Sequence, residues 1–483
     1  MILLLLILIP LVGGLLSWIA ASRSALWSRC IALGCLLINL VIVFQIWATK
    51  PAAGGKWLYQ FKAAWVPHFG ISLNLAMDGL SLLMLVLTFF LGALSVLISW
   101  KEINYRVGFF HFNLLFALTG ITGVFLTMDL FLFYFFWEMM LIPMYFLIGI
   151  WGHANREYAA NKFFIFTQAG GLLMLLAILA LYFIHGANTG VYTYDYFALL
   201  HTPMQQETAR WLMLGFLTAF LVKLPAVPFH TWLPDAHTEA PTAGSVVLAG
   251  LLLKTGAYGI LRLVLPLFPE ASLHFAPWIM LLGVLGIIYG GMLAYAQTDL
   301  KRLIAYTSVS HMGFVLVGAF SFNPLAYEGV VMQMIAHGIS TGALFIIAGA
   351  LYERIHTRNI QEMGGLWSKV PVMGSAAMIF VMGSLGLPGL GNFVAEFLIL
   401  LGSWQANRWI TVFAAIGLVV ATAYSLRIMQ KVFFGPSHGQ HVLPDLNKRE
   451  LVIIVALVMA ILLLGLYPQP VLNTTQKTDY VVR

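Results

Sequence analysis

The sequence predicts an all-α polytopic membrane protein with about fourteen transmembrane helices. Three observations carry this prediction: 61% of the 483 residues are hydrophobic, only 9% are charged, and the mean hydropathy is +0.92. Soluble globular domains carry about 25% charged residues, whereas here apolar runs of roughly 18 residues or more fill most of the chain. This composition excludes soluble enzymes, disordered chains, collagen-like chains and nucleic-acid-binding domains.

Apolar length places the helices in order along the chain. The first run starts at Met1 without a basic segment and without a small-residue cleavage site, which favours a retained helix over a removed signal peptide. The expected spans are 2–21, 26–48, 77–99, 109–126, 129–150, 162–184, 211–231, 243–264, 275–295, 302–320, 326–351, 373–401, 409–433 and 450–467.

The loops predict how the chain is oriented. An even number of spans puts both termini on one side, and the net charge of +7 is unevenly distributed between alternating short loops. One set of loops carries about twice as many Lys and Arg as the other, and the positive-inside rule assigns that set to the cytoplasm. We therefore expect a bacterial inner-membrane protein with both termini in the periplasm. The longer loops, 49–76 and 185–210, then lie outside, and their alternating aromatic residues predict small hairpins.

Six ionisable residues are predicted to lie at similar depth in six different helices. On insertion scales a charge at the bilayer centre costs roughly 2.5–3.5 kcal/mol, so such residues are functional candidates. They are Glu138, Lys223, Lys254, His311, His337 and Glu396. Together they predict a polar line in the plane of the membrane.

The chemistry of these residue types suits proton transfer. A carboxylate beside Lys223 keeps that lysine protonated, so movement of Glu138 away from it would release a proton toward Lys254. Histidine, which titrates near neutral pH, suits a relay between two such sites. The alternative is structural: Glu138 and one lysine form an ion pair that holds helices together. A second lysine one helix away is not explained by that alternative.

His311 has its own structural alternative, because Ser308 and Ser310 are close enough in sequence to satisfy it by hydrogen bonding. The weight of the functional interpretation therefore rests on the whole set of six residues.

Helix-breaking residues stand next to two of the charges. Proline removes a backbone donor and disturbs the preceding turn. The breakers are Pro225 and Pro228 after Lys223, and Gly386, Pro388, Gly389 and Gly391 before Glu396. Paired discontinuous helices point to an inverted-repeat transporter, whereas kinks made for packing alone are the alternative. Glu396 lies beyond its break, where an exit site on the outer side is expected.

No cofactor or metal is expected in this chain. Cys30 and Cys35 are too few for an iron–sulfur cluster. The segment HTWLPDAHTEAPT carries His230, Asp235, His237 and Glu239, but prolines interrupt it, and a turn that caps two helices fits better than a zinc site. The cluster Asp299, Lys301 and Arg302 is interpreted as a helix cap with surface charges.

Four stretches carry a family resemblance: WEMMLIPMYFLIGIWG, KLPAVPFHTWLPDAHTEAPTAGSVVLAGLLLKTGAYG, AQTDLKRLIAYTSVSHMGFV and QMIAHGISTGALFIIAGALYERIHTR. They resemble the antiporter-type membrane subunits of respiratory complex I and of Mrp cation/proton antiporters. Glu396, where sister subunits typically carry lysine, and the end of the chain soon after helix 14 favour the complex I branch that has no lateral helix.

The resemblance implies two inverted five-helix repeats with broken helices 7 and 12. It places them at 109–266 and 267–435, after three N-terminal helices in 1–108 and before helix 14 and a tail in 436–483. Glu138 and Lys223 would be the coupling pair and Glu396 the terminal site, with Lys254, His311 and His337 as the central relay. FMN, iron–sulfur clusters and quinone would be bound by partner subunits of complex I, and neighbouring antiporter-like subunits and lipid would surround this chain.

Two other functions remain open on the sequence. An Mrp-type subunit would exchange sodium for protons, but the predicted line offers mainly amines and imidazoles where sodium needs oxygens. A structural spacer would move nothing, and it would tolerate a neutral, volume-matched replacement of Glu138 and Lys223 together.

Overall fold

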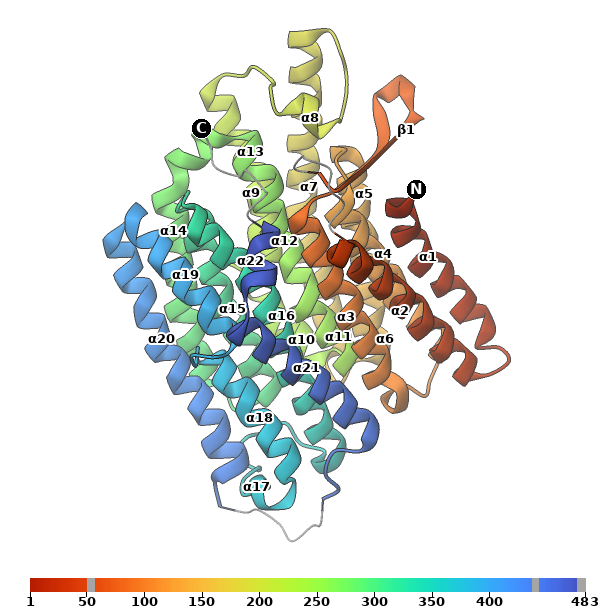
Figure 1. The fold of residues 1–483 in the computed structure, drawn as a ribbon, viewed down its shortest axis with the longest axis vertical. Helices are drawn as coiled ribbons and strands as arrows, with labels where there is room; N and C mark the ends of the chain where they lie inside the picture. The colour runs from red at the N-terminus through yellow and green to blue at the C-terminus, as the bar shows by residue number, and fades with distance from the viewer. Residues whose placement is uncertain (50–56, 437–442, 476–483) are drawn as a thin grey trace.

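The computed structural model describes residues 1–49, 57–436 and 443–475, and most of them lie in long helices along one axis (Figure 1). Among these residues, eleven helices are long and apolar enough to cross a membrane. Of the other expected spans, 302–320 coincides with a continuous 20-residue helix that is not among the eleven, whereas 211–231 and 373–401 are interrupted. The prediction of an all-α polytopic membrane protein is confirmed, and the count of fourteen stays a prediction.

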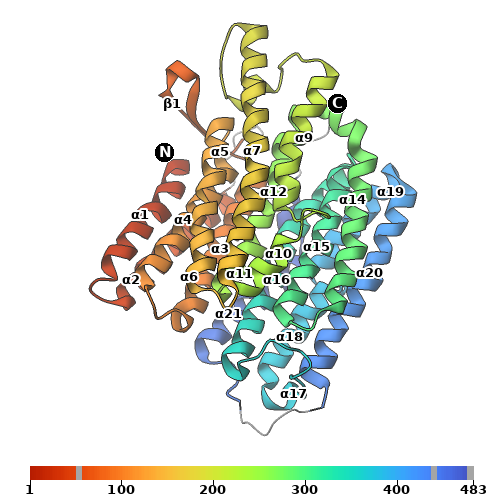
Figure 2. The same ribbon diagram turned by 180° about the vertical axis from the view of Figure 1, so that it is seen from behind.

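The N-terminal half of the chain forms one side of the molecule and the C-terminal half the other, as the colours in Figures 1 and 2 show. The elements up to the first broken helix are α1 (Ile2–Ala20), α2 (Ala25–Thr49), β1 (Tyr59–Val66), η1 (Pro67–Phe69), β2 (Ile71–Met77), α3 (Gly79–Glu102), α4 (Val107–Leu126), α5 (Leu130–Met139), α6 (Leu141–Trp151), α7 (Arg156–Thr189), α8 (Tyr196–Leu199), α9 (Gln206–Lys223) and α10 (Trp232–Glu239).

The next segment, 242–267, is one continuous helical stretch whose hydrogen bonding alternates between α- and π-type. It consists of α11 (Thr242–Val247), η2 (Leu248–Leu252), α12 (Leu253–Gly259), η3 (Ile260–Val264) and α13 (Leu265–Leu267). The remaining elements are α14 (Pro269–Ala296), α15 (Leu300–Ala319), α16 (Pro324–Ile355), α17 (Leu366–Lys369), α18 (Pro371–Ser384), α19 (Gly391–Ala406), α20 (Arg408–Ile428), η4 (Met429–Phe434), α21 (Lys448–Leu466) and α22 (Gln469–Thr475).

Short polar side chains start many of these helices. At a helix N-terminus an Asp or Asn oxygen accepts a hydrogen bond from a backbone N–H that has no partner within the helix. The residues that do so are Asp78, Asp129, Asp195, Asp299, Asn323, Asn407 and Asn447. The predicted capping role of Asp299 is therefore confirmed.

The helices differ in how much of their surface is buried within the protein. The most apolar 18-residue windows of 242–267 and α16 are completely buried, while those of α2, α20 and α21 are about one-third buried or less. Helices in the second group expose apolar side chains, as expected of surfaces that face lipid or other membrane subunits. The two completely buried helices carry Lys254 and His337.

The two ends of the molecule are distinct. At one end, called here the hairpin end, β1 and β2 pair antiparallel, with Tyr59 opposite Met77, and α8 lies nearby (Figure 1). The opposite, basic end carries the loops around Lys101, Arg156 and Arg358. The hairpin predicted for 49–76 is confirmed in its described part. The hairpin predicted for 185–210 is wrong, because that segment forms the end of α7, an extended stretch and α8.

Candidate functional site

Four of the six candidate residues form a continuous buried chain of contacts. The Lys254 Nζ atom lies 2.7 Å from His337 Nδ1, and His311 Nδ1 lies 2.9 Å from Glu396 Oε1. The rings of His337 and His311 have their centroids 5.6 Å apart. All four side chains are at most 2% exposed. Each member comes from a different element: the segment 242–267, α16, α15 or α19. Four of the six predicted residues therefore lie in contact with one another.

Neutral polar groups hold the imidazole of His311 in place. Its Nε2 atom lies 3.1 Å from the Ser384 hydroxyl and 3.2 Å from that of Tyr424. The Gln333 amide lies 3.4 Å from the Glu396 carboxylate. The expectation that neighbouring serines satisfy His311 is wrong, because Ser310 donates instead to the carbonyl of Ile287 on α14. His311 therefore forms its hydrogen bonds with groups from α16, α18, α19 and α20.

The π-type turn before Lys254 presents a backbone carbonyl to its ammonium group. Lys254 Nζ donates to the carbonyl oxygen of Ala249 at 2.5 Å. Ala249 lies on η2, five residues earlier in the chain. Turns of this type occur frequently at functional sites because they leave carbonyl oxygens open to other donors. The ammonium group thus has two acceptors, one fixed in the backbone and one on a histidine that can itself take up a proton.

Lys223 is the last residue of α9, at the point where the helix breaks. Its side chain is 1% exposed, and its Nζ atom lies 5.0 Å from the ring centroid of Trp137 and 5.6 Å from that of Phe163. A Cβ atom built on Gly256 would lie 3.2 Å from the Lys223 Cβ. α9 therefore packs closely against α12 only two residues from Lys254, which brings the two lysines onto neighbouring helices.

Glu138 lies near the junction of α5 and α6 and approaches α7. A Cβ atom built on Gly171 would lie 2.6 Å from its Oε1 atom, so only glycine leaves room for the carboxylate there. Tyr134 and Gln168 lie beside the same carboxylate. Within the described residues, no direct ion pair joins Glu138 to Lys223, although the two charges are close enough to interact through space. Glu138 and Lys223 are therefore neighbours without a direct ion pair, and the Lys223 ammonium lies near the rings of Trp137 and Phe163 instead.

Both predicted helix interruptions are present. α9 ends at Lys223 and the chain resumes helical form only at α10, while α18 ends at Ser384 and α19 begins at Gly391. Gly386 and Gly389 in the second interruption have φ of +81° and +96°, a conformation that favours glycine. A Cβ atom on Gly386 would lie 3.1 Å from Glu396 Oε2. The break therefore brings backbone close to the carboxylate that ends the buried chain.

A cavity of about 440 Å³ opens at the basic end. Glu102, His153 and Lys301 are among its lining residues. Lys301 donates to the Ala240 carbonyl at 2.9 Å, and Glu102 accepts from the Thr242 amide at 2.9 Å. These contacts place two charged side chains beside the start of the segment that carries Lys254.

His237 lies between this cavity and Lys254, and both lysines, Lys301 and Lys254, are close enough to act on its charge. Its ring stacks on Phe345 with centroids 4.7 Å apart, and among the described residues neither ring nitrogen has a hydrogen-bond partner. Sequence reasoning assigned His237 to a capping turn and missed this position. The HTWLPDAHTEAPT motif could have pointed to it through its density of titratable groups.

The other residues of that motif serve as connections between helices. Residues 232–239 form α10 rather than a turn. Asp235 forms ion pairs with Lys162 at 2.6 Å and Arg302 at 3.0 Å. Glu239 lies 3.7 Å from Arg358. Across the described ranges, no group of three or more His, Cys, Asp or Glu side chains is arranged to hold a metal ion.

Sequence comparison gives these features a family. The family described as "NADH:quinone oxidoreductase/Mrp antiporter, TM" matches residues 127–422. The NADH-quinone oxidoreductase subunit M of Pseudomonas aeruginosa is 56% identical over 491 aligned residues, covering 99% of this chain and 96% of that one. Its counterpart in Escherichia coli strain K12 is 55% identical, covering 97% and 95%. The chain belongs to the NADH:quinone oxidoreductase/Mrp antiporter family.

Solved structures of family members have the same fold. A chain of respiratory complex I from Thermus thermophilus with bound NADH matches with a TM-score of 0.90 at 30% identity, covering all of both chains. A chain of the Mrp complex from Dietzia sp. matches with a TM-score of 0.85 at 21% identity, covering 99% of this chain and 97% of that one. The second likeness establishes the common fold alone.

Proposed function

We propose that this chain is subunit M of a bacterial NADH:quinone oxidoreductase, respiratory complex I, and that it translocates protons through the buried Glu–Lys–His line. The observation that carries the proposal is the unbroken contact chain Lys254–His337–His311–Glu396. Each member can gain and lose a proton, and four nearly inaccessible ionisable side chains on four helices exceed what a scaffold needs. The relatives named subunit M support the assignment.

In this proposal the basic end faces the cytoplasm and the hairpin end faces the periplasm. Protons enter through the cavity lined by Glu102 and Lys301 and pass His237 to Lys254. They then move through the two central histidines to Glu396, which lies beyond the break between α18 and α19 and delivers them to the periplasmic side. Residues 109–266 and 267–435 would act as the two repeats that contain the inlet and outlet halves.

Lys223 and Glu138 act as the switch. When the Glu138 carboxylate approaches, it stabilises the protonated ammonium of Lys223. When it withdraws, Lys223 releases its proton toward the neighbouring Lys254, and Lys254 passes a proton on to His337. Translocating one charge against 100 mV takes about 2.3 kcal/mol, so the drive comes from NADH-to-quinone electron transfer elsewhere in the complex. FMN, iron–sulfur clusters and quinone belong to the partner subunits in this proposal.

The test is Lys223→Met in the intact complex. NADH:quinone turnover, proton pumping in inverted membrane vesicles and the amount of assembled complex are measured together. Pumping is expected to be lost while assembly is retained, because methionine fills the space between Trp137 and Phe163 without a charge. Lys431→Met, which removes an exposed lysine on η4, is the matched control and is expected to pump normally.

Two outcomes would overturn the proposal. Normal pumping by the assembled Lys223→Met complex would favour the spacer function. A requirement for sodium in place of protons would favour the Mrp-type function, although the contact chain presents amines and imidazoles where a sodium ion needs several oxygen ligands.

A further inference from the structure

A second set of buried charges lies outside the Glu–Lys–His line. Arg262, on η3, forms an ion pair with Asp78 at 2.7 Å, and the two side chains are 1% and 0% exposed. Asp78 caps the start of α3 at the hairpin end. Arg262 follows Lys254 by eight residues on the same helical stretch, which at 1.5 Å per residue places it about 12 Å closer to the hairpin end.

Polar side chains lead from the line to this ion pair. Lys254, Tyr258 and Arg262 are four residues apart and share one helix face. The Tyr258 hydroxyl accepts from Arg262 Nε at 3.1 Å and lies 3.2 Å from the Ser81 hydroxyl. If these polar side chains could pass a proton from one to the next, a proton on Lys254 would reach the hairpin end without passing through the histidines.

The hydrogen bonds among Tyr258, Arg262 and Asp78 prevent proton transfer along these side chains. A guanidinium group in a protein stays protonated, so Arg262 cannot accept a proton from Tyr258. The Tyr258 hydroxyl accepts a hydrogen bond from Arg262 and donates its own to the Phe125 carbonyl oxygen at 3.0 Å. A backbone carbonyl has no proton to pass on, so proton transfer ends there. The Asp78 carboxylate in turn accepts from both Arg262 and the Ser81 amide.

Aromatic rings cover the guanidinium group on the outer side. Its Cζ atom lies 5.1 Å from the ring centroid of Trp57 and 5.2 Å from that of Tyr258. Trp57 in turn packs edge-on against Phe197, with centroids 5.4 Å apart. These rings bury a charge that pairs with both the aromatic faces and Asp78.

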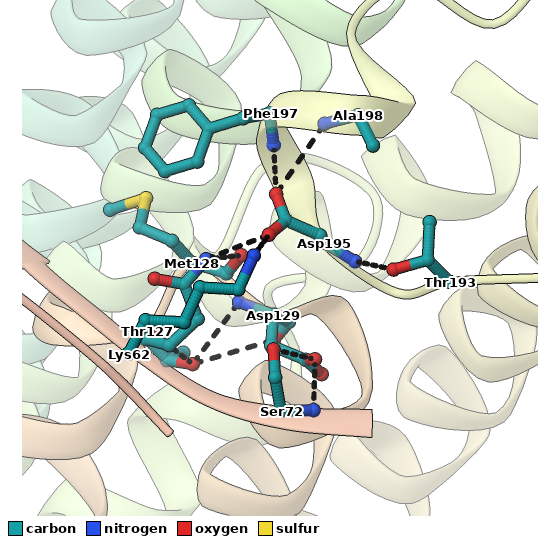
Figure 3. Close-up of polar contacts among 10 residues, drawn as sticks. Lys62, Ser72, Thr127, Met128, Asp129, Thr193, Asp195, Phe197 and Ala198 are labelled. Atoms are coloured by element: carbon teal, nitrogen blue, oxygen red, sulfur yellow. Dashed lines mark hydrogen bonds and ion pairs between the residues drawn. The ribbon is translucent and has the colours of Figure 1, made fainter. Parts of the chain in front are cut away.

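Two further carboxylates, Asp195 and Asp129, lie at the hairpin end, and Figure 3 shows their polar contacts. Asp195 accepts from Lys62 at 2.5 Å, and Asp129 accepts from the backbone and side chain of Ser72. The Lys62 side chain is 62% exposed, so the Lys62–Asp195 ion pair reaches solvent, whereas Asp129 is buried. The Phe197 amide donates to Asp195, and the Phe197 ring packs on Trp57, which covers Arg262. The Asp78–Arg262 pair is thus linked through this aromatic cover to a solvent-exposed ion pair on one side and to the helix of Lys254 on the other.

We propose that the Asp78–Arg262 pair is a proton seal, which closes the hairpin end of the first repeat and leaves His337 as the outlet for a proton on Lys254. This inference rests on the proposed role of Lys254 in proton transfer. A plain scaffold would need only a stable pair at this place, whereas a seal needs a cation that never releases its proton, and arginine meets that requirement.

The test measures passive proton leak in the purified complex reconstituted into liposomes, without NADH. The double variant Asp78→Asn/Arg262→Gln removes both charges together, because an uncompensated buried charge would destabilise the fold. An imposed pH gradient is expected to decay at least about tenfold faster per assembled complex, which corresponds to a barrier lowered by about 1.4 kcal/mol. Adding Lys254→Met is expected to restore the slow decay.

A matched control removes another buried pair, Arg354 and Glu450, which lie 2.7 Å apart with side chains 8% and 3% exposed. Arg354→Gln/Glu450→Gln is expected to leave the leak unchanged. Arg262→Lys is a second test variant that keeps the positive charge. Because lysine can release its proton, the seal predicts a faster decay of the pH gradient in this variant. A scaffold predicts no change in the decay.

Every outcome bears on the seal. A wild-type decay rate in either Arg262 variant, or a leak that persists with Lys254→Met, would overturn it. Because the leak is passive, this result is independent of whether Lys223→Met abolishes pumping. A leak through Lys254 together with normal pumping by Lys223→Met would support the seal and reject the switch.

Discussion

Replacing Glu396 with glutamine tests the end of the contact chain with little change in shape. The Glu396 carboxylate lies 2.9 Å from His311 Nδ1 in a site that is nearly inaccessible. At that separation and an effective dielectric constant of about 20, two unit charges attract by roughly 6 kcal/mol. Desolvation opposes most of this attraction, and hydrogen bonds to charged groups contribute about 1.5–3 kcal/mol net.

The side-chain amide introduced by Glu396→Gln would keep a hydrogen bond to His311 but lose that charge-assisted part. Since about 1.4 kcal/mol corresponds to a factor of ten, loss of about 1.5–3 kcal/mol at this contact is expected to slow proton transfer through it by roughly 10- to 150-fold. The complex should still assemble, because the shape and the neighbouring hydrogen bonds are retained.

The assay compares proton uptake by inverted vesicles, followed with a pH-sensitive dye, with the rate of NADH oxidation in the same preparation. Glu207→Gln, which neutralises an exposed carboxylate on α9, controls for loss of a negative charge and should pump normally. Glu396→Gln vesicles that pump at the wild-type rate, with normal amounts of complex, would refute the reasoning and remove Glu396 from the path.

Three further predictions concern other parts of the chain. Gly171→Val would bring a Cβ atom to 2.6 Å from Glu138 Oε1, and the displaced carboxylate should lower pumping without loss of assembly; normal pumping would remove Glu138 from the switch. Arg354→Met leaves the buried Glu450 carboxylate without its cation, and the free energy of unfolding should fall by about 3–5 kcal/mol; an unchanged melting temperature would contradict this. Burial and nearby cations lower the pKa of His153 to about 3 in the folded protein, below the value of 6.5 in the unfolded chain. Between these two values the unfolded state binds the extra proton, so the free energy of unfolding should fall as the pH drops from about 6.5 toward 3. His153→Gln should flatten that part of the melting-temperature profile, and a profile identical to wild type would contradict the assignment.

The charged residues illustrate how far sequence reasoning reached. It predicted one line of six residues, and four of them, Lys254, His337, His311 and Glu396, lie in contact with one another in the structure, while their role in proton transfer stays a prediction. A titratable group within an apolar run is visible in the sequence because the cost of its burial depends mainly on its own transfer free energy and depth.

Contacts between side chains on different helices were harder to predict from the sequence. Arg262 was assigned no role from the sequence, because its partner Asp78 lies 184 residues away at the border of a loop. Glu138 forms no direct ion pair with Lys223 among the described residues, and the Lys223 ammonium lies near the rings of Trp137 and Phe163. Which side chains meet depends on how each helix is rotated about its axis, and hydropathy does not encode that rotation.

The sequence by itself determined the membrane environment, the order of the helices and the places where two of them break. These properties follow from local free energies: apolar length for spanning, and proline or glycine for the interruptions at 224–231 and 385–390. The tertiary structure decided the rest. It set the partners of His311, the aromatic surroundings of Lys223 and the buried pairing of Asp78 with Arg262, because contacts between distant segments arise only when the helices pack.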